Sequence, residues 1–512
     1  MAIDKVVLAM QAALLSKYGD AGMARIARAL RALVSADKRR GLVTELIHLD
    51  DAAAMAPYGG PAPAIPDARA VKAAVDRIAA VLQPHYIVLL GGPDVMPMVP
   101  IVNPAYSGAD GDGDRHVPSD LPYACDAPYS TDANRFLGPT RVVGRLPDLI
   151  GARQPALLTR LINAAARAKP RPRADYQGSF GLSAQAWEKS TALSLTNTFG
   201  HADDLVTSPP RGPRWGARQL APRIHFINCH GGDSAPEYYG QPPDVEEFPV
   251  AHRASLLAGK VSAGTVVAAE CCYGAQLYDP GDAGGEKGIA LAYLEDGAAG
   301  VFGSTTIAYG PCEGNGAADL ICQYFIQQVL GGSSLGRAAL EARQKFAGAR
   351  THLDPYDLKT LMQFYLLGDP SAQPVAMSAH SLTQTKAFRK AFAGSQDRTV
   401  RNLRRERLER EGRNLGKSLP ALKSSKLAPA DKVASVLEAL RRESGLREDL
   451  VQLSFEIRPR GREPAPGQAR RVHVIKGRRP VIEAEQRVVR LVAIVATEEE
   501  GQLLHVRRLH SR

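Results

Sequence analysis

The segment TVVAAECCYGA, residues 265–275, decides the fold because it joins an unbroken apolar run to a polar turn. Such a run is typical of a strand buried on both faces of a sheet. A second segment, RIHFINCHGG at 223–232, has the same form. Around these two segments, the first 375 residues alternate helical and strand patterns, as α/β sheet proteins do. The sequence therefore predicts an open α/β sheet with polar residues at its strand ends.

The alternating pattern falls into two series, separated by the Pro- and Arg-rich segment KPRPRAD at 169–175. We expect two open-sheet subdomains of αβα layers, the first over residues 1–170 and the second over 171–375. After Pro374 the pattern changes to a very basic helical stretch, followed by an amphipathic helix and short strands. This change predicts a basic helical linker over 376–430 and a small α+β module over 431–512.

Length and composition narrow the class of protein. The chain has 512 residues, of which 45% are hydrophobic and 23% charged, so it is neither disordered nor fibrous and has room for two to four domains. No apolar run reaches the length of a membrane span, and the first residues read as mature sequence rather than as a signal peptide. The six cysteines are too sparse for a disulfide framework, which favours a reducing, cytoplasmic location.

The net charge of +11 is concentrated in the tail. Residues 376–512 hold 30 Lys and Arg against 16 Asp and Glu, whereas the remaining residues hold 34 against 37. Any acidic partner suggested by the charge would therefore bind the tail.

The two apolar segments place an imidazole and thiols at strand ends. If the two strands are neighbours, His230 and one of Cys271 and Cys272 meet at one edge of the sheet, where open α/β sheets bind ligands. A nearby His can activate a thiol and then protonate a leaving amine. The backbone N–H groups of Gly231 and of the cysteine could form an oxyanion hole. These parts suffice for acyl transfer through a thioester.

Other interpretations remain open. A buried Cys is usually a small hydrophobe and a buried His is usually structural. Zinc could bind a set drawn from Cys229, His230, Cys271 and Cys272, although adjacent side chains on a strand point to opposite faces. The loop with Asp110, Asp112 and Asp114 has calcium-loop spacing, but Arg115 and Leu121 stand where Gly and Glu are needed. We interpret it as a solvated loop, and we expect neither a metal nor a cofactor.

Several further motifs occur in a fixed order along residues 1–375. They are YIVLLGGPDVMP at 86–97, SDLPYAC at 119–125, VVGRLPD at 142–148, His230-Gly231, Cys271-Cys272-Tyr273-Gly274, VFGSTTIAYG at 301–310 and FYLLGDPS at 364–371. Together they resemble the gingipain-like cysteine peptidases, relatives of caspases and legumains. The resemblance implies two caspase-like subdomains and a cysteine endopeptidase with His230 as general acid/base.

The resemblance also suggests which cysteine reacts. The spacing Cys-x-x-Gly implies Cys271 as the nucleophile, with the amides of Gly231 and Cys271 as oxyanion donors. The caspase spacing, Cys-x-Gly, implies Cys272 instead. Strand alternation allows only one of the two into the crevice, and we favour Cys271, with Cys272 as the alternative nucleophile.

The positions of two residues in the sequence are the basis for an expected substrate preference. Arginine-specific relatives place an acidic residue before the helix of the second half, where this chain has Gln185 and Glu188. Glu188 could bind a basic substrate residue, or it could be a first-turn carboxylate favoured by the helix dipole. Tyr309 is the candidate aromatic wall of the same pocket.

The function predicted from the sequence is a cytoplasmic cysteine endopeptidase acting on protein substrates, and the position of Glu188 suggests cleavage after a basic residue. The alternative is a catalytically silent scaffold with the same fold. We expect the tail to be a regulatory or partner-docking module, outside the catalytic machinery, that binds a regulatory protein; the alternative, equally open from the sequence, is a solvated basic linker with a small packed domain. Nucleic acid is a less favoured partner because the basic segment lacks interleaved aromatics, and no membrane partner is expected.

Overall fold

The computed structural model of the chain describes residues 2–108, 112–243, 245, 247–376, 396–446, 451–460, 470–478 and 491–512. Asp110 lies outside these ranges, as does the first part of the predicted basic stretch. Among the helices of the described residues, none has the length and apolar character needed to cross a membrane.

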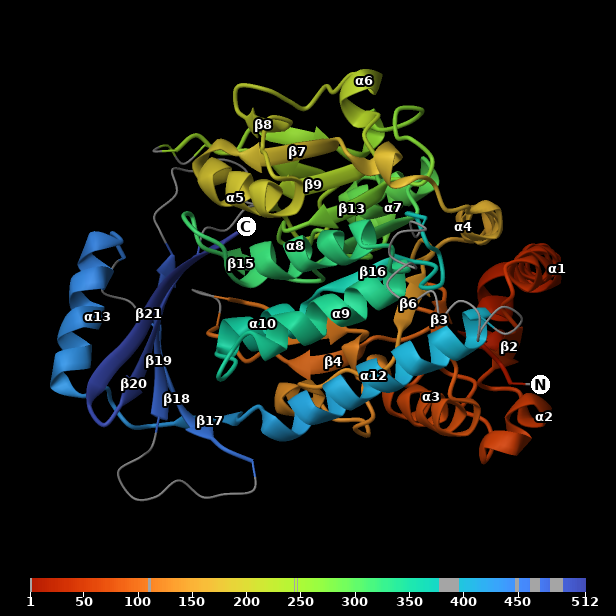
Figure 1. The fold of residues 1–512 in the computed structure, drawn as a ribbon, viewed down its shortest axis with the longest axis horizontal. Coiled ribbons are helices and arrows are strands. Elements are labelled where there is room, and N and C mark those ends of the chain that lie inside the picture. The colour runs from red at the N-terminus through yellow and green to blue at the C-terminus, as the bar shows by residue number, and fades with distance from the viewer. Residues whose placement is uncertain are drawn as a thin grey trace.

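One ten-stranded sheet runs through the molecule (Figure 1). Its strands, in spatial order, are β2 (Thr44–His48), β1 (Lys5–Ala9), β3 (Tyr86–Leu90), β6 (Val143–Leu146), β16 (Tyr365–Gly368), β14 (Gly300–Gly303), β13 (Val266–Ala269), β9 (Ile224–Asn228), β7 (Ser179–Ala184) and β8 (Leu205–Ser208). All neighbours are parallel except β14 and β16, which are antiparallel. The sheet therefore consists of two parallel halves that point in opposite directions.

These two halves match the two predicted series of strands except at β16, which comes from the second series but runs parallel to β6 in the N-terminal half. The α/β fold class is confirmed, and the two series share one continuous sheet and one large hydrophobic core. The boundary at residue 170 remains a prediction.

Helices cover the sheet in two rows. One row contains α5 (Glu188–Phe199), α8 (Ala317–Leu330) and α9 (Leu335–Gly348), which pack against one another. The other contains α1 (Gln11–Arg39), α4 (Ala156–Arg167) and α7 (Ile289–Glu295). Right-handed crossovers place α5 and α7 on opposite faces, because β7–β8 and β13–β14 step across the sheet in opposite directions. Shorter helices complete the body: α2 (Ala52–Met55), α3 (Ala68–Leu82), α6 (Ala217–Leu220) and α10 (Pro355–Gln363).

Two small antiparallel ribbons decorate the main sheet. One joins β4 (Val99–Val102) to β5 (His116–Ser119), and the other joins β10 (His230–Gly231), β11 (Glu237–Tyr239) and β12 (Val250–Arg253). The second ribbon begins where β9 ends, so it carries the chain away from the sheet at His230.

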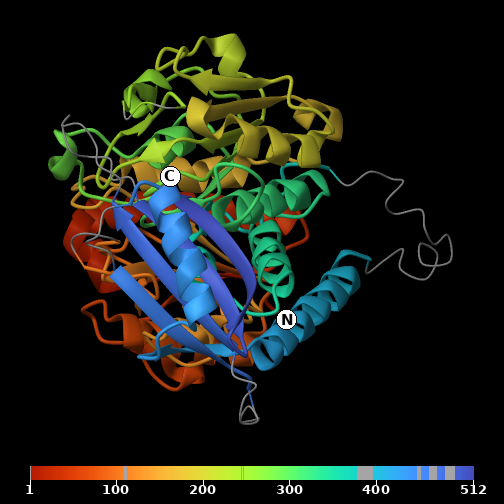
Figure 2. The ribbon, with the colours of Figure 1, turned by 90° about the vertical axis from the view of Figure 1, so that its left-hand side faces the viewer.

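The C-terminal module is an antiparallel sheet with one helix, as predicted. Its strands are β17 (Ala421–Ser425), β18 (Val451–Arg458), β19 (Arg470–Arg478), β20 (Leu491–Glu499) and β21 (Gln502–Ser511). Helix α13 (Asp431–Glu443) packs on one face, as Figure 2 shows, and alternate residues of the other face join the main hydrophobic core. Because β17 precedes residue 431, the module begins earlier than the sequence suggested. The sheet also includes β15 (Tyr309–Gly310), which belongs to the α/β body.

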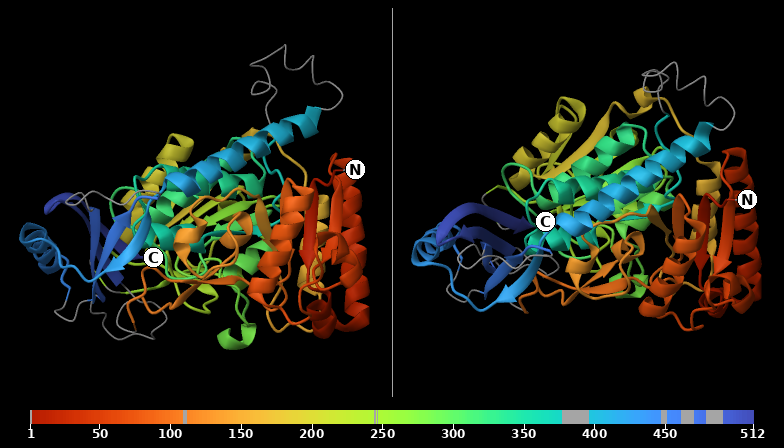
Figure 3. Two further views of the ribbon diagram at one scale, coloured as in Figure 1. Left: turned by 90° about the horizontal axis from the view of Figure 1, so that it is seen from below. Right: turned by 60° about the horizontal axis from the view of Figure 1, so that its bottom comes forward.

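The basic helix α12 (Gln396–Ser418) lies along the α/β body rather than in solvent (Figure 3). Arg404 binds Glu341 at 2.7 Å and Arg413 binds Asp126 at 3.1 Å, while Arg405 donates to the carbonyl oxygen of Gln83. Much of the basic charge of the tail is thus directed at acceptors within the same chain.

Three of the motifs quoted above make structural contacts. Arg145 forms two hydrogen bonds with Asp120, at 2.6 and 2.9 Å, which ties VVGRLPD to SDLPYAC. Lys5 forms a buried ion pair with Asp369 of FYLLGDPS at 2.6 Å.

The loop with calcium-like spacing differs from its predicted solvated state. Asp112 is fully buried, and Lys359 contacts Asp112 at 2.5 Å and Asp114 at 3.1 Å. The buried lysine needs counter-charges, and the two carboxylates supply them.

Candidate active site

The two deciding segments are neighbours in the sheet. Strands β9 and β13 pair in parallel with Ile227 opposite Ala269, and the amide of Glu270 donates to the carbonyl oxygen of Ile227 at 2.8 Å. Both chains therefore leave the sheet at the same edge. The condition that the sequence left open, that the strands before His230 and before the two cysteines are neighbours, is met.

Gly231 brings the two segments into direct contact. A Cβ atom at position 231 would lie 1.8 Å from the carbonyl oxygen of Cys272, far inside any allowed contact. Only glycine fits this close approach of two backbones. The amides of Gly231 and Cys272 consequently face the same small volume.

His230 is fully buried between two aromatic rings. Its ring centroid is 4.3 Å from that of Trp187 and 4.7 Å from that of Phe248. The Nε2 atom lies 2.9 Å from Oε1 of Gln241, whose amide nitrogen donates to the carbonyl oxygen of Val245 at 3.3 Å. That second bond orients the Gln241 amide, so Nε2 of His230 carries the proton and Nδ1 carries the lone pair.

The two adjacent cysteines point to different places. The thiol of Cys271 lies 3.9 Å from the carbonyl oxygen of Ile227. Burial is the main cause that raises the pKa of this thiol well above its ordinary value, and the neighbouring Cys229 raises it further. The thiol of Cys272 lies 3.6 Å from the carbonyl oxygen of Ala308, and burial raises its pKa to about 12. The thiol of Cys271 thus contacts the end of β9, whereas the thiol of Cys272 contacts the residue before β15.

The amide of Cys272, not that of Cys271, accompanies Gly231 at the site. Both amides donate to one oxygen of Arg512, at 3.2 Å from Cys272 and 3.5 Å from Gly231. This placement differs from the predicted pair of Gly231 and Cys271. The physical reason is that the chain leaves β13 after Ala269 and turns at Cys271, where the amide of Gly274 donates to its carbonyl oxygen, so that the amide of Cys272 faces the Arg512 oxygen.

The side chain of Arg512 fills a pocket beside these donors. Its guanidinium group binds the carboxylate of Asp319 at 2.8 Å, the carbonyl oxygen of Pro311 at 2.8 Å and the hydroxyl of Ser190 at 3.3 Å. The guanidinium carbon also lies 4.4 Å from the centre of the Trp187 ring. The pocket therefore offers a charge, two hydrogen-bond acceptors and an aromatic face, which together match a guanidinium group.

A second carboxyl group lies behind the pocket. Glu270 is fully buried, and burial together with the neighbouring Asp319 carboxylate raises its pKa well above the ordinary value. Burial and the neighbouring carboxylate thus favour the protonated form of Glu270.

The structure places the two predicted pocket residues elsewhere. Glu188 is exposed at the first turn of α5, which is the helix-dipole position that was its alternative interpretation. The hydroxyl of Tyr309 donates to Asp112 at 3.0 Å, so its ring packs beneath the cleft and does not line the pocket. The acid of the pocket is Asp319 and its aromatic wall is Trp187.

Sequence reasoning missed these pocket residues and Gln241. Asp319 lies in the first turn of a helix that the sequence did predict, but nothing in the local pattern distinguishes it from an ordinary capping carboxylate. A buried carboxylate near a cluster of buried polar residues is recognisable only in three dimensions.

The predicted alternatives that involve metal receive no geometric support. Across the ranges that the structure describes, no group of three or more His, Cys, Asp or Glu side chains is arranged to hold an ion.

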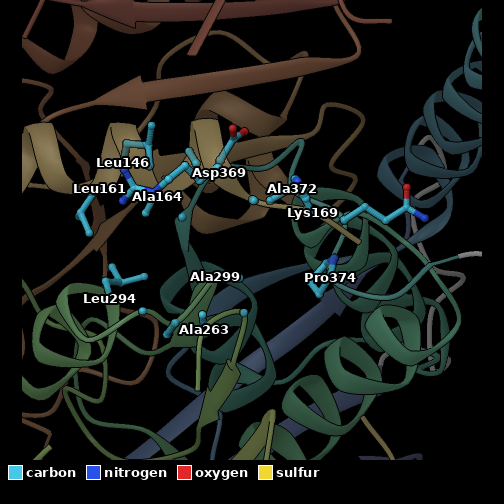
Figure 4. A pocket seen from close by; sticks show the side chains of 18 of the residues that line it. Leu146, Leu161, Ala164, Lys169, Ala263, Leu294, Ala299, Asp369, Ala372 and Pro374 are labelled. Carbon is cyan, nitrogen blue, oxygen red and sulfur yellow. The ribbon is translucent and has the colours of Figure 1, made fainter. Parts of the chain in front are cut away.

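An apolar cavity of about 290 Å³ lies at the opposite edge of the sheet (Figure 4). Its lining includes Ala263 and Ala299, which precede β13 and β14, and Leu146 at the end of β6. Asp369 is also in the lining but is engaged by Lys5. The cavity is therefore separate from the His230 and Cys272 edge.

The chain is an α/β protein in which His230 and the two adjacent cysteines follow neighbouring parallel strands. Beside them lies the pocket that holds the guanidinium group of Arg512. No protein-family model matches the chain, and no curated protein sequence matches it significantly. Among solved structures, a protease is similar with 13% identity and a TM-score of 0.46, over 99% of this chain and 97% of that chain.

Two crystal structures of the separase–securin complex of Saccharomyces cerevisiae are also similar. They show 14% and 12% identity and TM-scores of 0.29 and 0.27, and each match covers 45% of this chain but only 14% of that chain. These likenesses are distant, and the resemblance to gingipain-like peptidases remains a prediction. The function must therefore be inferred from the site itself.

Proposed function

We propose that the protein is a cysteine endopeptidase that cleaves polypeptides after arginine. The observation that supports this proposal most strongly is the way in which Arg512 is bound. Its guanidinium group fills the pocket and contacts Asp319, while its backbone oxygen accepts from the amides of Gly231 and Cys272. A peptide carbonyl in the same place would have its oxygen in an oxyanion hole.

The substrate would bind as an added strand. Tyr309 and Gly310 of β15 already pair with an extended segment, and the amide of Arg512 donates to the carbonyl oxygen of Ala308 at 2.9 Å. Main-chain pairing of this kind binds many sequences, and one side-chain pocket then sets the specificity.

Cys272 is the nucleophile in this proposal, and His230 is the acid and base. Nδ1 of His230 takes the thiol proton, the thiolate attacks the carbonyl carbon after arginine, and the amides of Gly231 and Cys272 stabilise the oxyanion. The imidazolium then protonates the leaving amine as the C–N bond breaks. Water, deprotonated by His230, hydrolyses the thioester and restores the thiol.

The pocket should prefer arginine to lysine. The planar guanidinium group can stack on Trp187 while it donates to Asp319 and the carbonyl oxygen of Pro311. A lysine ammonium group is a compact point charge and cannot reproduce that stacking.

The test compares wild type with Cys272→Ala and Cys271→Ala on fluorogenic peptides that present Arg, Lys or Ala before the leaving group. We expect cleavage after Arg, a loss of about a thousandfold or more in Cys272→Ala, and retained cleavage in Cys271→Ala. The opposite pattern between the two alanine variants would return the nucleophile to Cys271. If every variant fails to cleave, including one that lacks the last residues, the peptidase assignment fails.

A catalytically silent arginine-binding protein is the second candidate. It is favoured by the raised pKa of both thiols, which keeps them protonated in the closed cleft. A thiol-reactive peptide that ends in arginine separates the candidates, since only a peptidase should form an adduct at Cys272 faster than free cysteine does.

A further inference from the structure

The C-terminal strand β21 lies between two different parts of the molecule. On one side it pairs with β20 along its length, and on the other its end pairs with β15, with Tyr309 opposite Ser511 and Gly310 opposite His510. Figure 1 marks the end of the chain beside β15 and α5. The module therefore contributes the strand that fills the substrate-binding edge of the α/β body.

The end of this strand has the geometry of a bound product. Residues 510–512 run antiparallel to β15, the guanidinium group of Arg512 binds Asp319, and an oxygen of Arg512 accepts from Gly231 and Cys272. A Cβ atom at Gly310 would lie 2.3 Å from a guanidinium nitrogen, so even the opposing strand leaves room for this side chain. An arginine-containing substrate needs the same space.

The site that Arg512 occupies is closed to other ligands while Arg512 is bound. Arg512 and His230 are fully buried, and Cys272 is 3% exposed. Bound peptide and Arg512 therefore exclude each other.

The segment is anchored independently of the pocket. Leu509 belongs to the hydrophobic core, the hydroxyl of Ser511 accepts from the amide of Leu491 at 2.8 Å, and Arg507 binds Asp357 at 3.0 Å. These contacts hold the last residues next to the cleft. A tethered ligand acts at an effective concentration on the order of millimolar, so a product with a dissociation constant of about 0.1 mM would fill the cleft about ten times more often than leave it empty.

We propose that residues 510–512 are a built-in, reversible inhibitor of the cleft, in which Arg512 occupies the pocket and the amide donors that would otherwise bind an arginine of the substrate. The C-terminal module is thus a regulatory domain whose release of Arg512 opens the site. This inference rests on the proposed function for its enzymatic consequence, but the occupancy of the cleft does not depend on catalysis.

Occupancy can be tested by binding alone. In a Cys272→Ala background, calorimetry would measure binding of the peptide Leu-His-Ser-Arg to the full chain, to Arg512→Ala and to a chain ending at Leu509. We expect at least tenfold tighter binding by the two chains without Arg512. Arg508→Ala is the matched control, because Arg508 lies on the same strand but pairs with Glu443 of α13 at 3.2 Å; it should bind as the full chain does. Equal binding by all four chains would overturn the inference.

Activity supplies the second measurement. Arg512→Ala should raise kcat/KM for an arginine peptide about tenfold, mainly through a lower apparent KM, whereas Arg508→Ala should not. If both variants and wild type cleave equally well, the inference fails and the proposed peptidase stands. If no chain cleaves but the truncated chain alone binds the peptide, the peptidase fails and the occupancy stands.

The register of the segment can be tested by adding residues after Arg512. The added peptide bond would then lie where a scissile bond should, so the extension should be removed at a rate that does not depend on protein concentration. Mass spectrometry should find a new end at Arg512, and Cys272→Ala should keep the extension. An extension that survives in a chain that cleaves peptides, or that is removed only between molecules, would contradict the product register.

Discussion

In the N-terminal half of the ten-stranded sheet, polar groups near the strand ends are paired with fixed partners. Arg145 is held by Asp120, and Lys5 is held by Asp37 and Asp369. In the other half, the amides of Gly231 and Cys272 at the strand ends are paired with the last residue of the chain. In the N-terminal half, the partners of these polar groups are side chains packed in the core, so the strand ends there are structural. In the other half, a bound peptide could replace Arg512, which is why we place the proposed site there.

The largest expected effect comes from a substitution at the two amides that donate to Arg512. Gly231→Ala adds a methyl group 1.8 Å from the Cys272 carbonyl oxygen, so the two oxyanion donors must separate. We expect a loss of about a thousandfold in kcat/KM, which is the cost of a disrupted oxyanion hole. Steady-state kinetics would check it, with Gly178→Ala as control, because its nearest new contact is at 3.9 Å. Unchanged activity in Gly231→Ala would contradict the assigned donors.

The next largest effect comes from removing one of the fixed partners in the N-terminal half of the sheet. Arg145→Met leaves the buried Asp120 carboxylate without its partner, and we expect the free energy of unfolding to fall by about 3–5 kcal/mol. Urea denaturation would measure it. The double variant Arg145→Met, Asp120→Leu removes both charges and should recover part of the loss. A double variant as unstable as the single one would show that packing, not the unpaired charge, dominates.

A third variant sharpens the role of the pocket. Asp319→Asn removes the charge that faces the guanidinium group, and we expect kcat/KM for arginine peptides to fall about a hundredfold, or about 2.7 kcal/mol. Glu188→Gln is the control with the same chemical change on the neighbouring helix, and it should leave the kinetics unchanged because Glu188 is exposed. A larger effect from Glu188→Gln would restore the pocket acid predicted from the sequence.

The smallest effects concern pH and have opposite signs in the two halves. In the N-terminal half, burial and the nearby arginines lower the pKa of His85 from 6.5 to about 3, so its contribution to stability is lost as pH falls from 6.5 towards 3. In the other half, the pKa of Glu270 is raised above 4.5, so its contribution is lost as pH rises above 4.5. Each slope is at most about 1.4 kcal/mol per pH unit.

His85→Gln should therefore flatten the acid side of the stability curve, and Glu270→Gln should flatten the alkaline side. Denaturant midpoints measured across pH would show both. Two variants that flatten the same side would contradict at least one of the assigned directions.

Much of the half that carries His230 could be predicted from the sequence, because buried strands leave a clear apolar pattern. The apolar pattern predicted that His230 and the two cysteines follow buried strands, but the sequence left open whether those strands are neighbours, which the structure shows they are. Alternation also predicted that only one of the two cysteines enters the cleft. Which one it is depends on how the chain turns after Ala269, and that turn has no separate sequence signal.

The pocket and the tail could not be predicted for a different reason. Asp319 and Trp187 meet Arg512 through contacts between segments far apart in the chain, and each has an ordinary local explanation. The +14 balance of the tail likewise favoured an external acidic partner. The structure instead directs several of its arginines at Glu341, Asp126 and the Gln83 carbonyl of the same molecule.

The shared position of β21 has a thermodynamic consequence. Its last residues pair with β15 on one side and β20 on the other, so a peptide that takes the β15 edge must remove ordered residues from the module. By linkage, whatever loosens the module favours peptide binding, and peptide binding loosens the module by the same free energy. A ligand of this cleft would then lower the melting temperature of the C-terminal sheet, whereas ligands ordinarily raise the melting temperature of the domain they bind.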